Sequence, residues 1–304
     1  MTPLAIVLAL LFEHLRRLPA GGTLDTPASR FAAALAERYN DGRARSGRLV
    51  WLGVVGGAVV VTLTIHALLL SLDPMAAFGF NVIVLCGTLG AHRESRIFRE
   101  IHVALRLGEL ARARQMLGVW RGASVPRASE AEVVRLAIEH ALISAHRNIF
   151  ASVFWFTLLP GPTGAVMYRL AAVFDSTWGV RQDSDFGRFG VFARQAFQMV
   201  DWAPIRLTAA TFSVVGNFED AVLCWRTQAR QWMEYSSGIL LASGGGALGV
   251  RLGLPIHEHG RSIERPALGC GEEARVEFMQ GTVGLIWRAL CLCLLVLALM
   301  AIAG

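Results

Sequence analysis

The chain has 304 residues, 54% of them hydrophobic, and a mean hydropathy of +0.48, which is too apolar for an ordinary soluble domain. It carries 29 basic residues, all of them arginine, against 23 acidic residues, and these arginines flank apolar runs as they do in cytoplasmic membrane loops. The sequence therefore predicts an integral membrane protein, and without a zinc-finger, RNA-recognition or helix-turn-helix signature we expect no nucleic-acid partner.

The first predicted elements are a short apolar segment and a membrane hairpin. Residues 2–12 are apolar but only about 16 Å long as a helix, so they form either a re-entrant or interfacial helix or a crossing extended through Leu15 and Leu18. Residues 49–72 give the clearest transmembrane helix, Asp73-Pro74 predicts a tight turn, and residues 75–90 return, so 49–90 is a transmembrane hairpin. The arginine-rich stretches 16–48 and 93–121 should then both be cytoplasmic.

A cytoplasmic helical loop is predicted over residues 91–148. Arginine, glutamate and leucine recur at helical spacing over 93–121, which predicts an amphipathic helix pair with a break near Gly108. Ser129 and Glu132 fit a capping box, in which a hydroxyl and a carboxylate satisfy free main-chain amides, so a helix should start there and run to about Phe150.

The motif-bearing core, residues 139–255, interleaves ionisable and amide side chains with apolar sequence. Residues 150–159 and 164–174 are apolar halves too short to cross alone, and the Pro160–Gly164 turn predicts either a kinked helix or a re-entrant hairpin covered by protein. Another short apolar segment is expected over 204–215, starting at Pro204. The glycine-rich stretch 238–255 predicts close helix packing more strongly than ligand contact. Because polar groups at membrane depth are costly, a functional site is the first hypothesis for this core.

Residues 283–303 complete the chain as a C-terminal transmembrane helix. Together the elements predict an all-α polytopic integral membrane protein with about four to six membrane segments, some short or re-entrant, and a cytoplasmic amphipathic helical loop. We expect one membrane domain over residues 1–304, in the bacterial inner membrane, with the lipid bilayer as a partner and a homo-oligomer as an open alternative.

Several motifs from Glu139 onward resemble those of the CobD/CbiB family of membrane proteins. They are Phe154-Trp155-Phe156, Gly164 through Tyr168-Arg169, Asp175-Ser176, Phe189-Gly190, Pro204-Ile205-Arg206-Leu207-Thr208-Ala209, and Gly246-Ala247-Leu248-Gly249-Val250-Arg251-Leu252-Gly253. The runs Leu10 to Leu15 and Asp201 to Leu207 also resemble AmpE, a relative in the same superfamily.

The CobD/CbiB resemblance implies ATP-dependent synthesis of adenosylcobinamide or its phosphate. ATP, with Mg²⁺, activates a corrinoid propionate, and the amine of aminopropanol or its phosphate displaces the activating group to form an amide. Such chemistry needs carboxylates for Mg²⁺, arginines for phosphoryl oxygens and a general base. The resemblance gives the metal and catalytic role to Asp175 and the general base to His146 or Glu139. The implied substrate-binding residues are Asn148, Tyr168, Arg169, Arg206, Thr208, Gly246 and Gly249.

Two departures from the family pattern keep other functions open. A Glu-Asn-Thr-Ser-Asp-Gly run is replaced by residues 144–149, and an acidic pair is replaced by Phe197-Gln198. The alternatives are a non-catalytic inner-membrane regulator resembling AmpE, which is associated with cell-wall recycling and β-lactamase induction, and a carrier for an amphiphilic metabolite. Neither alternative requires a cofactor.

Structural roles are also predicted for some of these residues. Arg206 beside Pro204 could anchor a helix start to the lipid headgroups, and Glu139 could pair with Arg169 as an ion bridge between helices. His257 and His259 are interpreted as part of a solvent-exposed loop rather than a metal site, because no third ligand is evident in the sequence.

Overall fold

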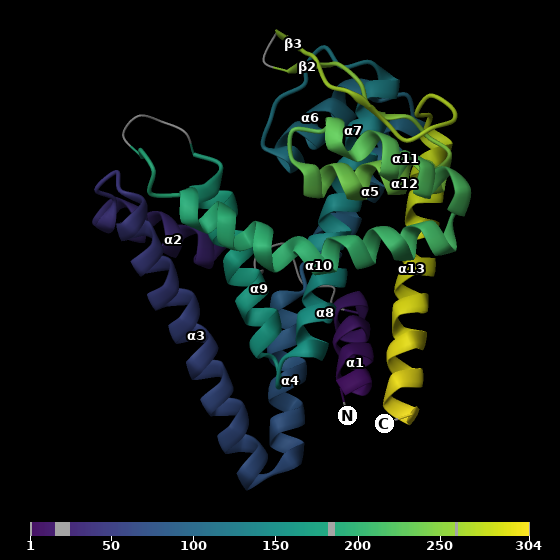
Figure 1. Ribbon diagram of the computed structural model, residues 1–304. Helices are drawn as coiled ribbons and strands as arrows, with labels where there is room; N and C mark the ends of the chain where they lie inside the picture. The colour runs from purple at the N-terminus through teal and green to yellow at the C-terminus, as the bar shows by residue number, and fades with distance from the viewer. Residues whose placement is uncertain (1, 16–24, 182–185, 259–260, 304) are drawn as a thin grey trace. The chain divides into compact units, whose positions relative to one another are not determined.

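The computed structural model describes residues 2–15, 25–181, 186–258 and 261–303 (Figure 1). Their helices are α1 (Thr2–Leu15), α2 (Asp25–Tyr39), α3 (Ala44–Leu72), α4 (Pro74–Thr88), α5 (Ala91–Arg106), α6 (Leu110–Arg121), α7 (Glu130–Ala145), α8 (Ala151–Leu158), α9 (Thr163–Phe174), α10 (Val191–Val215), α11 (Phe218–Gln228), α12 (Tyr235–Leu248) and α13 (Val276–Ala303). Two π-helical turns, η1 (His146–Phe150) and η2 (Asp175–Gly179), and a 3₁₀ turn, η3 (Ala229–Gln231), join them. The strands are β1 (Leu252–Gly253), β2 (Ile256–Glu258), β3 (Arg261–Ile263) and β4 (Ala267–Leu268).

The chain forms two compact units, each built from two separate stretches of sequence. Unit 1 comprises residues 1–90 and 147–204, and unit 2 comprises residues 91–146 and 205–304. Within the described residues, three helical stretches are long and apolar enough to cross a membrane: Ala44–Leu72, Pro74–Arg106 and Val276–Ala303. A shorter apolar helix covers Pro3–Glu13. The predicted all-α polytopic membrane protein is confirmed.

In unit 1, the predicted hairpin of α3 and α4 is confirmed (Figure 1). Its turn is built by Asp73, whose carboxylate accepts hydrogen bonds from the backbone N–H groups of Met75 and Ala76, at 2.9 and 3.2 Å. Asp73 is thus the N-cap that allows Pro74 to open the returning helix. The stretch 16–48 was predicted as a loop, but it contains α2, whose Ala32 carbonyl accepts a hydrogen bond from Trp178 Nε1 at 2.9 Å.

Helices α8 and α9 pack together as a hairpin rather than continuing as one kinked helix. Their close approach depends on Gly164, where an added Cβ would lie 2.0 Å from the Trp155 carbonyl oxygen. At the turn, Gly161 has φ of +59° and packs against the ring of His66. Helix α9 also packs against α3 and α4, but the turn is only partly covered by protein, because Pro162 is buried whereas Leu158 and Pro160 are exposed.

Helix α10 corrects the prediction of a short apolar segment starting at Pro204. The helix begins at Val191, so Pro204 lies inside it and Arg206 does not mark a helix start. The polar residues Arg194, Gln195 and Gln198 in the first half of α10 lie on its exposed face. The buried face carries Ala193, Ala196, Phe197 and Asp201, which is the spacing of an amphipathic helix.

In unit 2, the predicted helix pair is confirmed as α5 and α6, with the break at Gly108, where φ is +76°. Helix α7 begins as predicted, because Ser129 Oγ accepts a hydrogen bond from the Glu132 N–H at 3.2 Å. It packs against α5, α6, α12 and α13.

The glycine-rich stretch forms α12, which is buried around its circumference and packs against α7, α11 and α13. An added Cβ at Gly246 would lie 2.6 Å from the Asp220 carbonyl oxygen, so only a residue without a side chain allows this approach. After α12 the chain forms two small antiparallel pairs, β1 with β4 and β2 with β3, which the sequence analysis did not anticipate. The C-terminal helix is confirmed and starts at Val276, earlier than predicted.

Candidate functional site

The predicted site residues fall in both units. Unit 1 contains Asn148, Tyr168, Arg169 and Asp175, whereas unit 2 contains Glu139, His146, Arg206, Thr208, Gly246 and Gly249. A single pocket lined by residues of both units stays a prediction.

The two π-helical turns carry three of the predicted residues. His146 and Asn148 belong to η1, and Asp175 opens η2. A π-helical turn inserts one residue into a helix and is often found at functional sites. All three side chains are buried, with exposed fractions between 1% and 8%. Buried polar groups on irregular helical turns make these positions candidates for a functional site.

In unit 1, residues of α9 form two buried polar pairs, one with Asp201 of α10 and one with Asn148 of η1, together called the unit 1 network. Tyr168 Oη donates a hydrogen bond to Asp201 Oδ1 at 2.8 Å, and Arg169 Nη1 donates one to Asn148 Oδ1 at 2.5 Å. Gly90 packs against the second pair, because a Cβ there would lie 3.2 Å from Arg169 Nη2. The network brings together a carboxylate, a phenol, an amide and a guanidinium, which together can bind a polar substrate group.

Asp201 is a buried carboxylate beside Tyr168 that the predicted set omitted. Where the family has an acidic pair, this chain has Phe197 and Gln198, but Asp201 lies one helical turn after Phe197 on the same buried face of α10. Both residues contact Tyr168, since the Phe197 and Tyr168 ring centroids are 5.8 Å apart. The spacing of four residues between Phe197 and Asp201 was the sequence pattern that could have indicated Asp201.

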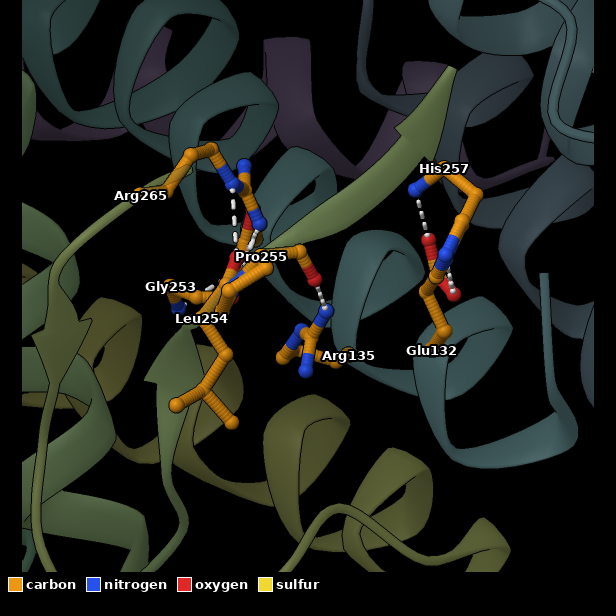
Figure 2. A network of polar contacts seen from close by, with 8 residues as sticks. Glu132, Arg135, Gly253, Leu254, Pro255, His257 and Arg265 are labelled. Atoms are coloured by element: carbon orange, nitrogen blue, oxygen red, sulfur yellow. Dashed lines mark hydrogen bonds and ion pairs between the residues drawn. The ribbon is translucent and has the colours of Figure 1, made fainter. Parts of the chain in front are cut away.

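Unit 2 holds a second polar network, in which Arg265 and Gly253 bind the carboxylate of Glu139; Figure 2 labels Arg265 and Gly253. The carboxylate of Glu139 accepts hydrogen bonds from the Gly253 N–H at 2.9 Å and from Arg265 Nη1 and Nη2 at 3.0 and 3.1 Å. Both side chains are largely buried, with 7% and 13% exposed. The sequence suggested Arg169 as the ion-pair partner of Glu139, but the partner in the structure is Arg265.

The segment Gly253–Pro255 is held on α7 by arginine side chains. Arg265 donates to the carbonyls of Gly253 and Leu254, at 2.8 and 3.1 Å, and Arg135 Nη2 donates to the Pro255 carbonyl at 2.7 Å. Burial lowers the pKa of the Arg135 guanidinium. Leu254 has φ of +62°, the only positive value for a non-glycine residue in the described part of the chain. These bonds hold the backbone in a strained conformation.

Glu132 joins the start of α7 to strand β2 (Figure 2). Its Oε1 accepts a hydrogen bond from the His257 backbone N–H at 2.7 Å, and its Oε2 lies 3.5 Å from His257 Nδ1. The predicted capping box is therefore half confirmed: the Ser129 hydroxyl caps the helix, whereas the Glu132 carboxylate binds a residue 125 positions away. The Glu132 side chain is 8% exposed and that of His257 is 55% exposed.

The other predicted residues of unit 2 have specific partners. His146 Nδ1 lies 2.9 Å from Thr208 Oγ1, and the Arg206 guanidinium lies 5.8 Å from the centre of the Tyr235 ring. Gly246 is a packing residue, and Gly249 ends α12 with φ of +67°. Substrate binding by Arg206, Thr208, Gly246 and Gly249 stays a prediction.

Within the described ranges, no group of three histidine, cysteine, aspartate or glutamate residues is arranged to hold a metal ion. His259 lies outside the described residues, so the interpretation of His257 and His259 as a pair stays a prediction. Mg²⁺ often takes only one or two protein carboxylates and receives its remaining ligands from substrate phosphates and water. Asp175 and Asp201 are both buried carboxylates of unit 1, and a Mg²⁺ ion delivered with a nucleotide would need only one such residue from the protein.

Comparison with known proteins shows the family. The sequence model of the family described as "CobD/Cbib protein" matches residues 4–286. A "Cobalamin biosynthesis protein CobD" of Stutzerimonas stutzeri is 32% identical over 97% of this chain and 96% of its own length. The protein of that name from Chromobacterium violaceum is 35% identical over 80% of this chain and 79% of its own.

A "Cobalamin biosynthesis protein CbiB" of Salmonella typhimurium is 25% identical over 90% of this chain and 89% of its own length. No solved structure matches the chain significantly. The resemblance in the core motifs therefore extends over nearly the whole sequence, and this multi-pass membrane protein belongs to the CobD/CbiB family.

Proposed function

We propose that this chain is the amide-forming enzyme of cobalamin biosynthesis in the bacterial inner membrane. It joins adenosylcobyric acid to aminopropanol or aminopropanol phosphate and gives adenosylcobinamide or its phosphate. The observation that carries this proposal is the family match over residues 4–286, together with relatives named for cobalamin biosynthesis that align over most of their length.

Buried polar residues of unit 1 supply groups suited to this reaction. Asp175 and Asp201 are the carboxylates available for nucleotide-borne Mg²⁺, and Arg169 is a guanidinium for phosphoryl or propionate oxygens. Bound ATP would supply the activation of the corrinoid carboxyl group. Residues 144–149 and 197–198 lack the carboxylates of the family pattern. Unit 1 still has a buried acidic group there, because Asp201 lies on the same buried face of α10 as Phe197.

Complementation of a cobinamide-synthase-deficient strain tests the proposal. The unmutated gene should restore growth that depends on cobalamin synthesis, and Asp175→Asn should nearly abolish that growth. Asp41→Asn is the matched control, because Asp41 is a fully exposed carboxylate of unit 1 that only caps the local turn through Arg43 N–H and Ser46 Oγ.

Arg206→Ala should lower kcat/KM by about tenfold to a hundredfold, as expected for a charged hydrogen bond of roughly 1.5–3 kcal/mol.

Failure of the unmutated gene, with the protein expressed and inserted, would contradict the ligase function. A non-catalytic regulator resembling AmpE, or a carrier, would then be the better description. Equal loss with Asp175→Asn and Asp41→Asn would instead remove Asp175 from the site.

A further inference from the structure

In unit 1, the start of α3 lies beside the segment that leads into α10 (Figure 1). The Arg188 N–H donates a hydrogen bond to the Gly42 carbonyl at 2.9 Å. Gly47 lies so close to Phe189 that an added Cβ would be 2.0 Å from the Phe189 carbonyl oxygen. These contacts bring five exposed arginines to one end of α3, together called the arginine cluster: Arg43, Arg45, Arg48, Arg188 and Arg194.

Aromatic packing holds the two segments of the arginine cluster against each other. The rings of Trp51 on α3 and Phe192 on α10 meet edge to face, with their centroids 5.4 Å apart. The Arg48 guanidinium lies 5.3 Å from the centre of the Phe192 ring, a distance at which a cation is attracted to an aromatic ring. The arginine cluster is therefore positioned by packed helices, which hold a site more precisely than a loop does.

The arginine cluster has few acidic neighbours. In the sequence, residues 41–48 and 181–194 contain six arginines and three aspartates. One of these, Asp41, already accepts hydrogen bonds from the Arg43 N–H and the Ser46 hydroxyl, at 2.9 and 2.7 Å. Helix α2, which also packs against α3, carries two residues of each charge. None of the five clustered side chains forms an ion pair with a described residue, so the positive charge of this surface is uncompensated.

The exposed face of α3 changes from cationic to apolar at Leu49. Arg45, Arg48, Leu49 and Leu52 occupy positions i, i+3, i+4 and i+7 of the helix, so they lie along one face, and all four are exposed. The apolar run of α3 starts at Leu49, which places the arginines at the membrane surface and the leucines among the acyl chains. A phospholipid presents its phosphate and acyl chains in the same order, whereas a free phosphate would match only the arginines.

We infer that the arginine cluster binds the headgroup phosphate of an anionic phospholipid, whose acyl chains lie along Leu49 and Leu52. Arginine directs two N–H groups at a phosphate, so side chains from α3 and from the start of α10 can share one headgroup. A zwitterionic lipid would bring its own cationic amine to an already cationic surface, so an anionic lipid is preferred. The bound lipid would link α3 to α10, the helix that carries Asp201.

The double variant Arg45→Gln, Arg188→Gln tests this inference, because it removes one arginine from each segment and neither side chain has a partner among the described residues. The full-length protein in a neutral detergent is titrated with phosphatidylglycerol and, separately, with phosphatidylcholine. Bound lipid is counted by native mass spectrometry, and the melting temperature is recorded. The unmutated protein should bind phosphatidylglycerol more tightly and be stabilised more by it. The double variant should lose about tenfold to thirtyfold in affinity for phosphatidylglycerol, as expected for two arginines near a lipid surface.

Two further variants separate the effect of charge from that of folding. Arg45→Lys with Arg188→Lys keeps both charges and should retain most of the preference for phosphatidylglycerol. Arg99→Gln with Arg127→Gln removes two exposed arginines of unit 2 and should bind phosphatidylglycerol like the unmutated protein. Without lipid, all variants should share one melting temperature. Because the clustered arginines are exposed, raising the salt concentration should weaken binding to the unmutated protein.

Several results would overturn the inference. The first is equal affinity of the unmutated protein for the two lipids, and the second is normal phosphatidylglycerol binding by Arg45→Gln, Arg188→Gln. Equal losses in the unit 2 variant would show attraction by net charge alone, and a lower melting temperature of the glutamine variant without lipid would show a structural role. Displacement of phosphatidylglycerol by an equal concentration of inorganic phosphate would identify a free-phosphate site instead. None of these measurements depends on amide formation, so the lipid site and the proposed function can fail separately.

Discussion

The hydrogen-bond partners of Glu139 in the folded protein do not favour the role of general base that its sequence motif suggested. Three N–H donors, one from Gly253 and two from Arg265, surround its carboxylate. A general base must offer a free lone pair to its substrate. This geometry therefore favours Glu139 as the anchor of the strained segment at Leu254.

At this scale we predict that Glu139→Ala destabilises the protein by roughly 3–5 kcal/mol, because Arg265 would stay buried without its counter-charge. The measurement is the free energy of unfolding of the protein in detergent micelles. Glu272→Ala is the control, since it breaks an exposed pair with Arg275 that should contribute about 0–1 kcal/mol. Similar losses for the two variants would contradict the anchoring role.

Among the elements, the hairpin of α8 and α9 depends on a single small residue at its point of closest approach. Gly164 lets the start of α9 rest directly on the Trp155 carbonyl, and α9 in turn packs against α3 and α4. The position of Tyr168 and Arg169 on α9 is therefore set by a helix contact rather than by a loop. A site built on packed helices is held more precisely than one built on a loop.

Gly164→Ala should separate α8 from α9, because its Cβ would lie 2.0 Å from a backbone oxygen that no side-chain rotation can move. We expect a loss of about 1–3 kcal/mol or more in unfolding free energy, with a matching loss of activity. Gly57→Ala in α3 meets no atom within 4 Å and should be neutral or slightly stabilising. An unchanged melting temperature for Gly164→Ala would show that the two helices do not pack this closely.

Elements that follow from local chemistry could be predicted from the sequence, whereas those that depend on distant partners could not. The Asp73 turn, the Ser129 cap and the break at Gly108 each depend on a few adjacent residues. The Glu139–Arg265 contact joins two segments that are 126 residues apart in the chain. One sequence has no local pattern that specifies such pairs, so Arg265, Arg135 and Asp201 were missing from the predicted site.

For the whole molecule, the distribution of arginines sets the expected orientation in the membrane. Residues 16–48 and 93–121 each contain seven arginines, and the α3–α4 hairpin lies between them. Positive charge in short loops is retained in the cytoplasm during insertion. The hairpin turn at Asp73 should then face the opposite side.

Reporter fusions test this orientation directly. Fusions after Gly42 and after Arg121 should both show cytoplasmic activity, whereas a fusion at Asp73 should report the external side. Opposite results for Gly42 and Arg121 would require an odd number of crossings between them and would disprove the hairpin as a membrane-crossing pair.

The interleaving of the two units also has a consequence for how the protein is made. Synthesis proceeds from the N-terminus, so the ribosome completes the α3–α4 hairpin and then translates residues 91–146 of unit 2 before it reaches α9. At about 5–20 residues per second, those 56 residues alone take roughly 3–11 s. During that interval the face of α3 that carries Trp51 and His66 has no α9 to cover it. Insertion factors and membrane proteases therefore meet a nascent hairpin whose surface differs from that of the mature protein.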